Sequence, residues 1–279
     1  MTCTRRLRID GPVNFLRDTA CGWLASGEPA VLVEVLEASG STPREAGARM
    51  LVSTSAAAGT VGGGHLELKA MEHARQMLHG GPAELQVRYP LGPSLGQCCG
   101  GVVTLGFSRL SAETLAVWPD ETARFHLQLH GAGHVGRAVA RLLAELPVTV
   151  DWIDERDSEF PQTLGGARWP AHIRRRPADD AEGEVSLAAP GGRYLVMTHR
   201  HDLDLRITEA ILKRGDFGFL GLIGSQTKRQ RFVHHLESRG IPAAVLARMT
   251  CPIGLPGITG KEPAVLALAV VAQLMTGGP

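Results

Sequence analysis

The sequence has no surplus of charge and no long apolar run, and both absences narrow its possible functions. Among its 279 residues, Lys and Arg number 29, and Asp and Glu number 28. Because these charges nearly cancel, no overall field favours nucleic acid or an anionic membrane as a partner. The longest apolar run, residues 263–275, is shorter than the roughly 20 residues that a membrane span needs. We therefore expect a globular protein that binds neither, with enough hydrophobic residues for two domains.

Cysteine is scarce, and the first residues contain no apolar segment. Basic residues open the sequence, but no apolar core follows them, so no secretory signal is visible. The five cysteines are an odd number without regular spacing. Because disulfides belong mainly to exported proteins, this pattern predicts reduced thiols and a cytoplasmic location.

Residues 125–154 predict a strand, a glycine turn, a helix and a second strand. Gly131, Gly133 and Gly136 have the spacing GxGxxG directly after an apolar run. Glycine lets a phosphate approach the backbone, and the free N–H groups of the following helix attract an anion. Asp154 ends the second strand about twenty residues later, where an acid can accept a hydrogen bond from ribose. The stretch predicts a dinucleotide site, unless the glycines only pack a βαβ unit.

A second glycine run, Gly62, Gly63 and Gly64, stands nearer the N-terminus. It precedes a helix that we expect to continue to about Leu78. Three glycines at a helix start leave exposed amides, so the run is a second candidate site for an anion or a flat ligand. A flexible linker is the alternative, although the run contains no serine and has apolar neighbours.

Cys98 and Cys99 are adjacent in a glycine-rich loop. A structural disulfide between them is not expected, because neighbouring side chains of an extended chain point apart and such a bridge is strained. No second Cys or His pair stands nearby at zinc-ligand spacing. One or both thiols could meet a soft metal or a sulfur-transfer partner, or could be inert and buried.

Strand and helix patterns alternate and predict an α/β fold with two domains. We expect an N-terminal α+β domain over residues 1–110 and a linker over residues 111–124. A Rossmann-like domain with a parallel sheet should follow over residues 125–279.

The loops after the strands of that parallel sheet are the expected ligand site. Ligands of open α/β sheets bind beyond the carboxyl ends of the strands. The loops at Gly131, Asp154, His199 and Gly224 should therefore converge on one crevice, where Ser225 precedes a basic helix. A second histidine two residues after His199 gives a metal-like spacing. Without a third ligand, we favour contact with solvent or substrate.

Seven segments of the sequence together resemble the XdhC/CoxI family of xanthine dehydrogenase accessory proteins. The segments are GSTPREAGARMLV from Gly40, GTVGGGHLE from Gly59, LGQCCGG from Leu95, HGAGHVGRAVA from His130, THRHDLDL from Thr198, GLIGSQTKRQRF from Gly221 and CPIGLPGITGKEPAVLALAV from Cys251. They span nearly the whole sequence in order, and their combination is more specific than any single motif.

The resemblance implies a chaperone-like protein that binds the molybdenum cofactor, a molybdopterin. Such a protein protects the cofactor while its oxo ligand is exchanged for sulfido with a cysteine desulfurase, and then delivers it to xanthine dehydrogenase. This is an insertion factor without catalytic residues of its own. By position, the resemblance assigns contacts with the cofactor to both thiols and to both glycine turns. The thiols would also be ligands of the metal. With the expected crevice, the candidate cofactor contacts are Gly62, Gly63, Gly64, Cys98, Cys99, Gly131, Gly133, Gly136, Asp154, His199 and Ser225.

Two other functions are compatible with the sequence. The first is an NAD(P)-dependent oxidoreductase that uses the glycine turn and Asp154, with His199, His201 or Lys228 as proton donor. The second is a regulatory or scaffold protein, in which the apolar C-terminal helix supplies the face of a homodimer.

Overall fold

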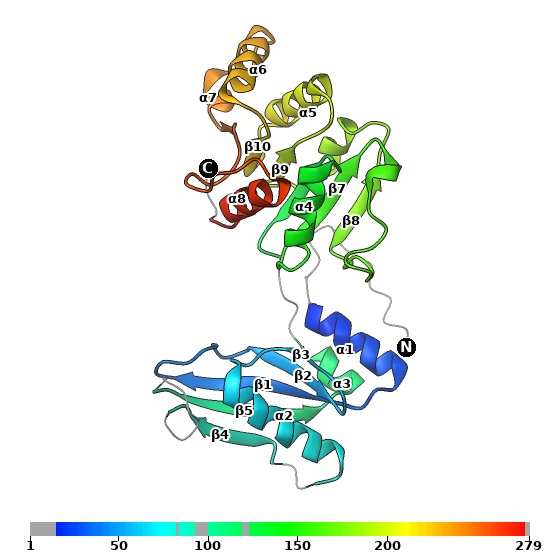
Figure 1. Cartoon of the computed structure of the whole chain (residues 1–279), viewed down its shortest axis with the longest axis vertical. Helices are drawn as coiled ribbons and strands as arrows, with labels where there is room; N and C mark the ends of the chain where they lie inside the picture. Colours follow the sequence, from blue (N-terminus) through cyan, green and yellow to red (C-terminus); the bar gives the residue numbers. More distant parts are fainter. Residues whose placement is uncertain (1–14, 82–83, 93–99, 119–122, 277–279) are drawn as a thin grey trace. The chain divides into compact units, whose positions relative to one another are not determined.

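The chain folds into two compact units, each with its own sheet and hydrophobic core. The computed structural model describes residues 15–81, 84–92, 100–118 and 123–276. The described residues up to 118 form one unit, and those from 123 on form the other (Figure 1). We call them unit 1 and unit 2.

Unit 1 is an antiparallel sheet in the strand order β3-β2-β1-β5-β4. Its elements are α1 (Phe15–Ser26), β1 (Ala30–Ser39), β2 (Arg49–Ser53), β3 (Ala57–Gly59), α2 (Gly64–Leu78), β4 (Gln86–Pro90), β5 (Val102–Arg109) and α3 (Ala112–Ala116). Residues of β1 alternate between the two faces, as the twofold period of a strand requires. Val31 and Val33 pack with α2, whereas Leu32 packs with α1 and α3.

Unit 2 is a parallel sheet in the strand order β11-β10-β9-β6-β7-β8. Its main elements are β6 (His126–His130), α4 (His134–Leu143), β7 (Thr149–Asp154), β8 (Ile173–Pro177), β9 (Arg193–Val196), α5 (His201–Arg214), β10 (Phe219–Leu222), α6 (Gln226–Ser238), α7 (Ala243–Leu246), β11 (Met249–Thr250) and α8 (Pro263–Met275). The chain runs outward from β6 to β8 and then returns to the other side of β6 with β9. The topological switch point, where ligands of such sheets bind, therefore lies between β6 and β9.

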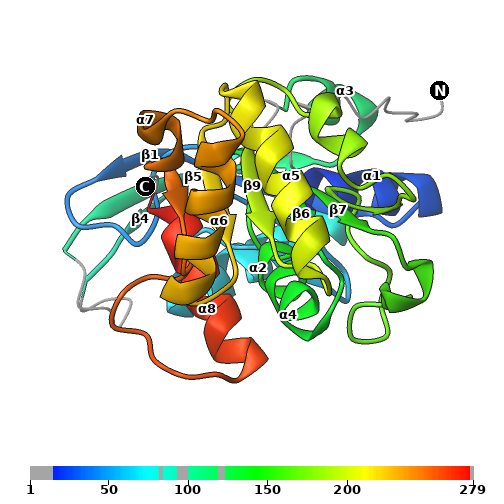
Figure 2. The same cartoon turned by 90° about the horizontal axis from the view of Figure 1, so that it is seen from above.

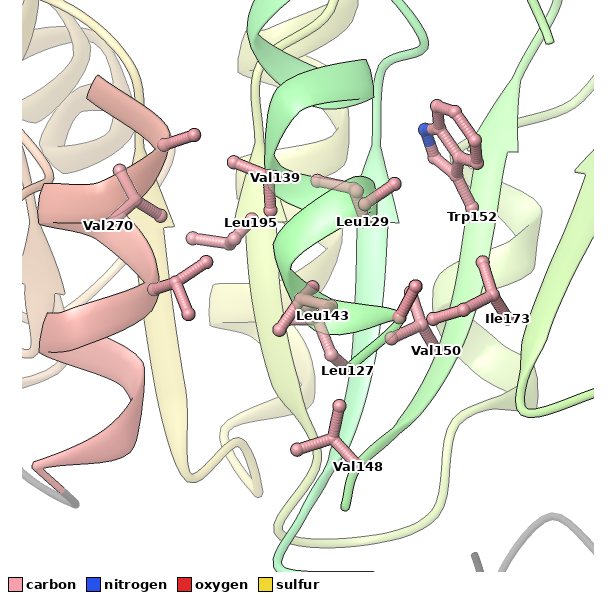
Figure 3. Close-up of a cluster of buried hydrophobic side chains, with 14 of the residues drawn as sticks. Leu127, Leu129, Val139, Leu143, Val148, Val150, Trp152, Ile173, Leu195 and Val270 are labelled. Atoms are coloured by element: carbon pink, nitrogen blue, oxygen red, sulfur yellow. The ribbon is translucent and has the colours of Figure 1, made fainter. Parts of the chain in front are cut away.

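Helices cover both faces of the parallel sheet and bury the central strands. Helices α4 and α8 pack on one face, and α5 and α6 lie beside each other on the other face (Figure 2). On the first face, Leu127 and Leu129 of β6 pack in one hydrophobic core with Val139 and Leu143 of α4 and Val270 of α8 (Figure 3). This double cover holds the carboxyl ends of the strands in fixed positions.

The predicted fold class is confirmed: an α+β unit precedes a Rossmann-like unit with a parallel sheet. The region that we expect as a linker, residues 111–124, is partly structured, because α3 and Trp118 pack in the core of unit 1. The strands β3 and β11 were not predicted. They contain three and two residues, too few to show a strand pattern. Across the described residues, no helix combines the length and apolar character needed to cross a membrane.

Candidate functional site

The glycine turn of unit 2 connects β6 to α4 at the switch point of the sheet. Gly131 has a φ of 124°, and a Cβ atom there would overlap the carbonyl oxygen of Met197, which follows β9. A Cβ atom on Gly136 would overlap the carbonyl oxygen of Gly131. Both positions therefore need glycine so that β6, β9 and α4 can approach each other.

The N-terminus of α4 offers amides to a ligand. Gly133 is the N-cap residue and makes no side-chain capping hydrogen bond. A Cβ atom built on Gly133 meets no atom within 4 Å, so the space beside it is open. First-turn N–H groups without a cap are a suitable site for an anion. This terminus is the one at which the sequence predicts a phosphate site.

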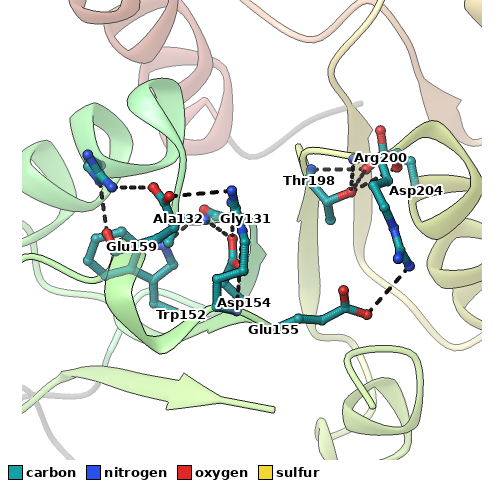
Figure 4. Close-up of polar contacts among 11 residues, drawn as sticks. Gly131, Ala132, Trp152, Asp154, Glu155, Glu159, Thr198, Arg200 and Asp204 are labelled. Atoms are coloured by element: carbon teal, nitrogen blue, oxygen red, sulfur yellow. Dashed lines mark hydrogen bonds and ion pairs between the residues drawn. The ribbon is translucent and has the colours of Figure 1, made fainter. Parts of the chain in front are cut away.

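Asp154 supports the glycine turn from the end of β7, with only 2% of its side chain exposed. Its Oδ2 accepts a hydrogen bond of 2.7 Å from the Ala132 amide (Figure 4). The Arg156 guanidinium donates to both carboxylate oxygens, at 3.0 and 3.1 Å. Burial raises the pKa of Asp154, but the hydrogen bonds from Arg156 and Ala132 outweigh it and lower the pKa. A ribose hydroxyl would have to displace one of these donors.

An ion pair joins the first turns of α5 and α6, the helices that follow β9 and β10. Asp204, with 1% of its side chain exposed, lies 2.6 Å from the Lys228 ammonium. Lys228 also donates to the carbonyl oxygen of Ile223 at 2.8 Å. Asp204 accepts from the Thr198 amide at 2.9 Å and from the Thr198 hydroxyl at 2.6 Å. Lys228 is therefore engaged in structure and is a poor candidate for a proton donor.

The remaining predicted residues of unit 2 lie in the loops that follow β9 and β10. His199 is exposed between β9 and α5. Ser225 caps α6 by accepting a hydrogen bond of 3.2 Å from the Lys228 amide. The loops after β6, β7, β9 and β10 thus share the carboxyl edge of the sheet. Contacts link these neighbouring segments: Ala132 of the glycine turn binds Asp154 at the end of β7, and Asp204 of α5 binds Lys228 of α6.

The glycine run of unit 1 encloses a carboxylate of its own chain. Oε1 of Glu67, in the first turns of α2, accepts from the amides of Gly63 at 2.8 Å and Val61 at 3.1 Å. The amide of Gly62, at 3.3 Å, and the hydroxyl of Thr60 donate to the same oxygen. Burial raises the pKa of Glu67, but these hydrogen bonds outweigh it and lower the pKa. Gly62 and Gly63 therefore do not present free amides, contrary to our expectation for this run.

The loop after β1 contacts both the glycine run and Gly101. A Cβ atom on Gly62 would overlap the ring of Pro43. One on Gly101 would lie 2.5 Å from the carbonyl oxygen of Ser41 and 2.8 Å from Thr42. Glycine at both positions therefore lets this loop approach closely. The predicted thiols Cys98 and Cys99 lie outside the described residues.

Some supporting residues were not predicted from the sequence. Glu67 and Asp204 each stand at the fourth position of a helix and bind the loop before it. An acid at this position after a glycine or threonine loop is a readable signal, related to the capping box. Within the described parts of the chain, no three His, Cys, Asp or Glu side chains form a group that could hold a metal ion.

Comparison with known proteins connects both units to one family. The family model for the XdhC Rossmann domain matches residues 127–274, and that for the XdhC and CoxI family matches residues 23–90. The uncharacterized protein YqeB of Escherichia coli K12 is 27% identical over 254 residues, which are 88% of this chain and 43% of YqeB. The chain thus spans less than half the length of this relative.

A solved structure shares the fold over nearly the whole length of the chain. It is a crystal structure of a protein described as a xanthine dehydrogenase, from Bacillus halodurans. The TM-score is 0.70 at 18% sequence identity, over 94% of this chain and 95% of the other. At this identity, the similarity establishes the fold and nothing further.

Proposed function

The chain belongs to the XdhC and CoxI family, and from that membership we propose that it is an accessory protein of xanthine dehydrogenase that binds the molybdenum cofactor. It protects the cofactor while a cysteine desulfurase supplies the sulfido ligand, and then inserts it into the dehydrogenase. The observation that carries this proposal is the match of both family models, in order, over the two units. We propose a homodimer and a cytoplasmic location as part of the same function.

The charges around the two glycine turns favour unit 2 as the binding site for the cofactor phosphate. At the turn of unit 2, Arg156 neutralises Asp154 through two hydrogen bonds. At the run of unit 1, only neutral groups among the described residues donate to Glu67. An uncompensated carboxylate repels a second anion, whereas a compensated one does so weakly. The first-turn amides of α4 therefore suit the phosphate better than those of α2.

The thiols are a separate part of the proposal. Thiolates are good ligands for soft metals, so Cys98 and Cys99 would face the metal, which supplies the redox chemistry of the dehydrogenase. This assignment is supported by the family resemblance of the segment LGQCCGG. The contact of Gly101 with the loop of Ser41 and Thr42 constrains the chain just after the thiols.

Pterin content of the purified protein tests this function. The full chain, expressed in a host that makes molybdopterin, should carry a pterin that fluoresces after oxidation. Cys98→Ala or Cys99→Ala should lower the content. Cys21→Ala, which alters another thiol of unit 1, is the matched control and should leave it unchanged. A pterin-free protein that still activates xanthine dehydrogenase fully would refute the proposal.

The sheet order and the GxGxxG turn favour dinucleotide binding as a second candidate function. Against it, both oxygens of Asp154 accept hydrogen bonds, and the Lys228 ammonium is paired with Asp204. Calorimetric titration with NADH and NADPH separates the two functions. Binding at micromolar concentration would support an oxidoreductase, and no heat at millimolar concentration would leave that function without its cofactor.

A further inference from the structure

An ion pair spans the end of the central strand of unit 2. Glu155 follows β7, and Arg200 follows β9, on the two sides of β6. The Arg200 guanidinium lies 3.7 Å from Oε1 of Glu155. The two side chains extend toward each other from opposite loops (Figure 4). Because β6 leads into the glycine turn, this pair crosses the carboxyl edge at the switch point.

This ion pair is loose compared with its neighbours. Arg200 has 43% of its side chain exposed, and its second partner, Asp202, lies 3.6 Å away with 70% exposed. Both distances exceed those of a good hydrogen bond. By contrast, Arg156 binds Asp154 at 3.0 Å, and Lys228 binds Asp204 at 2.6 Å. Exposed and distant pairs contribute little to stability, so Arg200 can exchange partners at little cost.

We propose that Arg200 binds the phosphate of a ligand held at the glycine turn, and that Glu155 competes with this phosphate for the guanidinium. An arginine fork binds phosphate through two hydrogen bonds, which are stronger than the long contact to Glu155. A phosphate would then displace Glu155 from Arg200, whereas a neutral ligand would leave the Arg200–Glu155 pair intact. This inference rests on the proposed binding of the cofactor phosphate in unit 2, and it adds a residue that sets ligand specificity.

The two sides of the pair should have opposite effects on anion affinity. We would titrate the full chain with inorganic pyrophosphate by calorimetry at fixed ionic strength. Arg200→Gln should weaken binding about tenfold, because it removes a hydrogen bond between charged groups. Glu155→Gln should strengthen it roughly threefold, because it removes a competitor worth a fraction of that bond. Arg200→Lys keeps the charge without the fork and should fall between wild type and Arg200→Gln.

A double variant separates competition for Arg200 from a general effect of net charge on anion affinity. In the Arg200→Gln background, Glu155→Gln should give no further gain, because the competition no longer exists. Arg206→Gln and Glu182→Gln are matched controls, since that pair also lies on the surface of unit 2 at 3.9 Å. They change the net charge equally and should leave pyrophosphate affinity within about twofold of wild type.

Three results would overturn the proposed competition between Glu155 and phosphate. The first is additivity of the Arg200 and Glu155 substitutions, and the second is an equal effect of the control pair. The third is absence of pyrophosphate binding to both wild type and Glu155→Gln at millimolar concentration. None of these results decides the proposed function, because the pterin content of the wild-type protein is measured independently.

Discussion

Removing Lys228 should destabilise unit 2 strongly, because Asp204 would remain as an unpaired charge in the interior. Only 1% of the Asp204 side chain and 11% of the Lys228 side chain are exposed. Breaking a buried pair by deleting one partner costs about 3–5 kcal/mol. Asp204 keeps the hydrogen bonds from the Thr198 amide and hydroxyl, so we expect the lower end, about 3 kcal/mol, for Lys228→Met.

Amide hydrogen exchange is the suitable assay, because it measures the free energy of opening for β9 and β10 separately from unit 1. Arg206→Met is the control for the loss of a cation: its pair with Glu182 is 3.9 Å long and exposed, so the change should cost less than about 0.5 kcal/mol. The double variant Lys228→Met with Asp204→Asn removes the buried charge but keeps acceptors for Thr198. It should recover about 1 kcal/mol or more relative to Lys228→Met alone. Equal opening energies for Lys228→Met and Arg206→Met would refute the reasoning.

Three further predictions follow from the same contacts. Glu67→Gln should lower the free energy of unfolding of unit 1 by about 1–2 kcal/mol at pH 7. Since the pKa of Glu67 is lowered from 4.5 in the folded state, this difference should shrink as urea unfolding is repeated at pH values falling through 4.5 and below. Gly136→Ala should destabilise unit 2 by about 1–3 kcal/mol in urea, because its Cβ overlaps the Gly131 carbonyl oxygen. Gly133→Ala should cost less than about 1 kcal/mol, the preference for glycine over alanine at an N-cap, but should weaken pyrophosphate binding because its Cβ enters the open space beside the turn. Burial lowers the pKa of His130 from 6.5 to about 3, so the unfolded state takes up a proton that the folded state does not. The stability of the wild type should fall by up to about 1.4 kcal/mol per pH unit from pH 6.5 downward, and His130→Gln should flatten that slope in urea titrations.

The fold was largely predictable because its signals are local and periodic. The run of Val and Leu in β1, whose first four residues are all buried, and the helical spacing in α4 are both visible within a few residues of sequence. The glycines at 131 and 136 mark a turn that only residues without a Cβ can make. The short strands β3 and β11 were missed because pairing with β2 and β10 defines them, and neither has a pattern of its own.

The candidate site was less predictable, since a sequence shows which groups are present but not which are already engaged. Asp154 stands where an acceptor for a ribose hydroxyl is expected, yet Arg156, two residues later, already donates to both of its carboxylate oxygens. Glu67 fills the amides that the glycine run was expected to offer. The approach of Glu155 to Arg200 depends on the order of the strands, which places residues 45 positions apart on the two sides of β6.

Three loops are held in the same way: a carboxylate of the chain itself accepts a hydrogen bond from a backbone amide shortly before a helix begins. Glu67 does so before α2, Asp154 before α4 and Asp204 before α5. Each loop is therefore shaped before any ligand arrives, which reduces the ordering cost of binding. The cations differ: Arg156 compensates Asp154 and Lys228 compensates Asp204, while the described donors to Glu67 are neutral. An anionic ligand thus meets less repulsion in unit 2, where the open first turn of α4 and the loosely held Arg200 are both available to it.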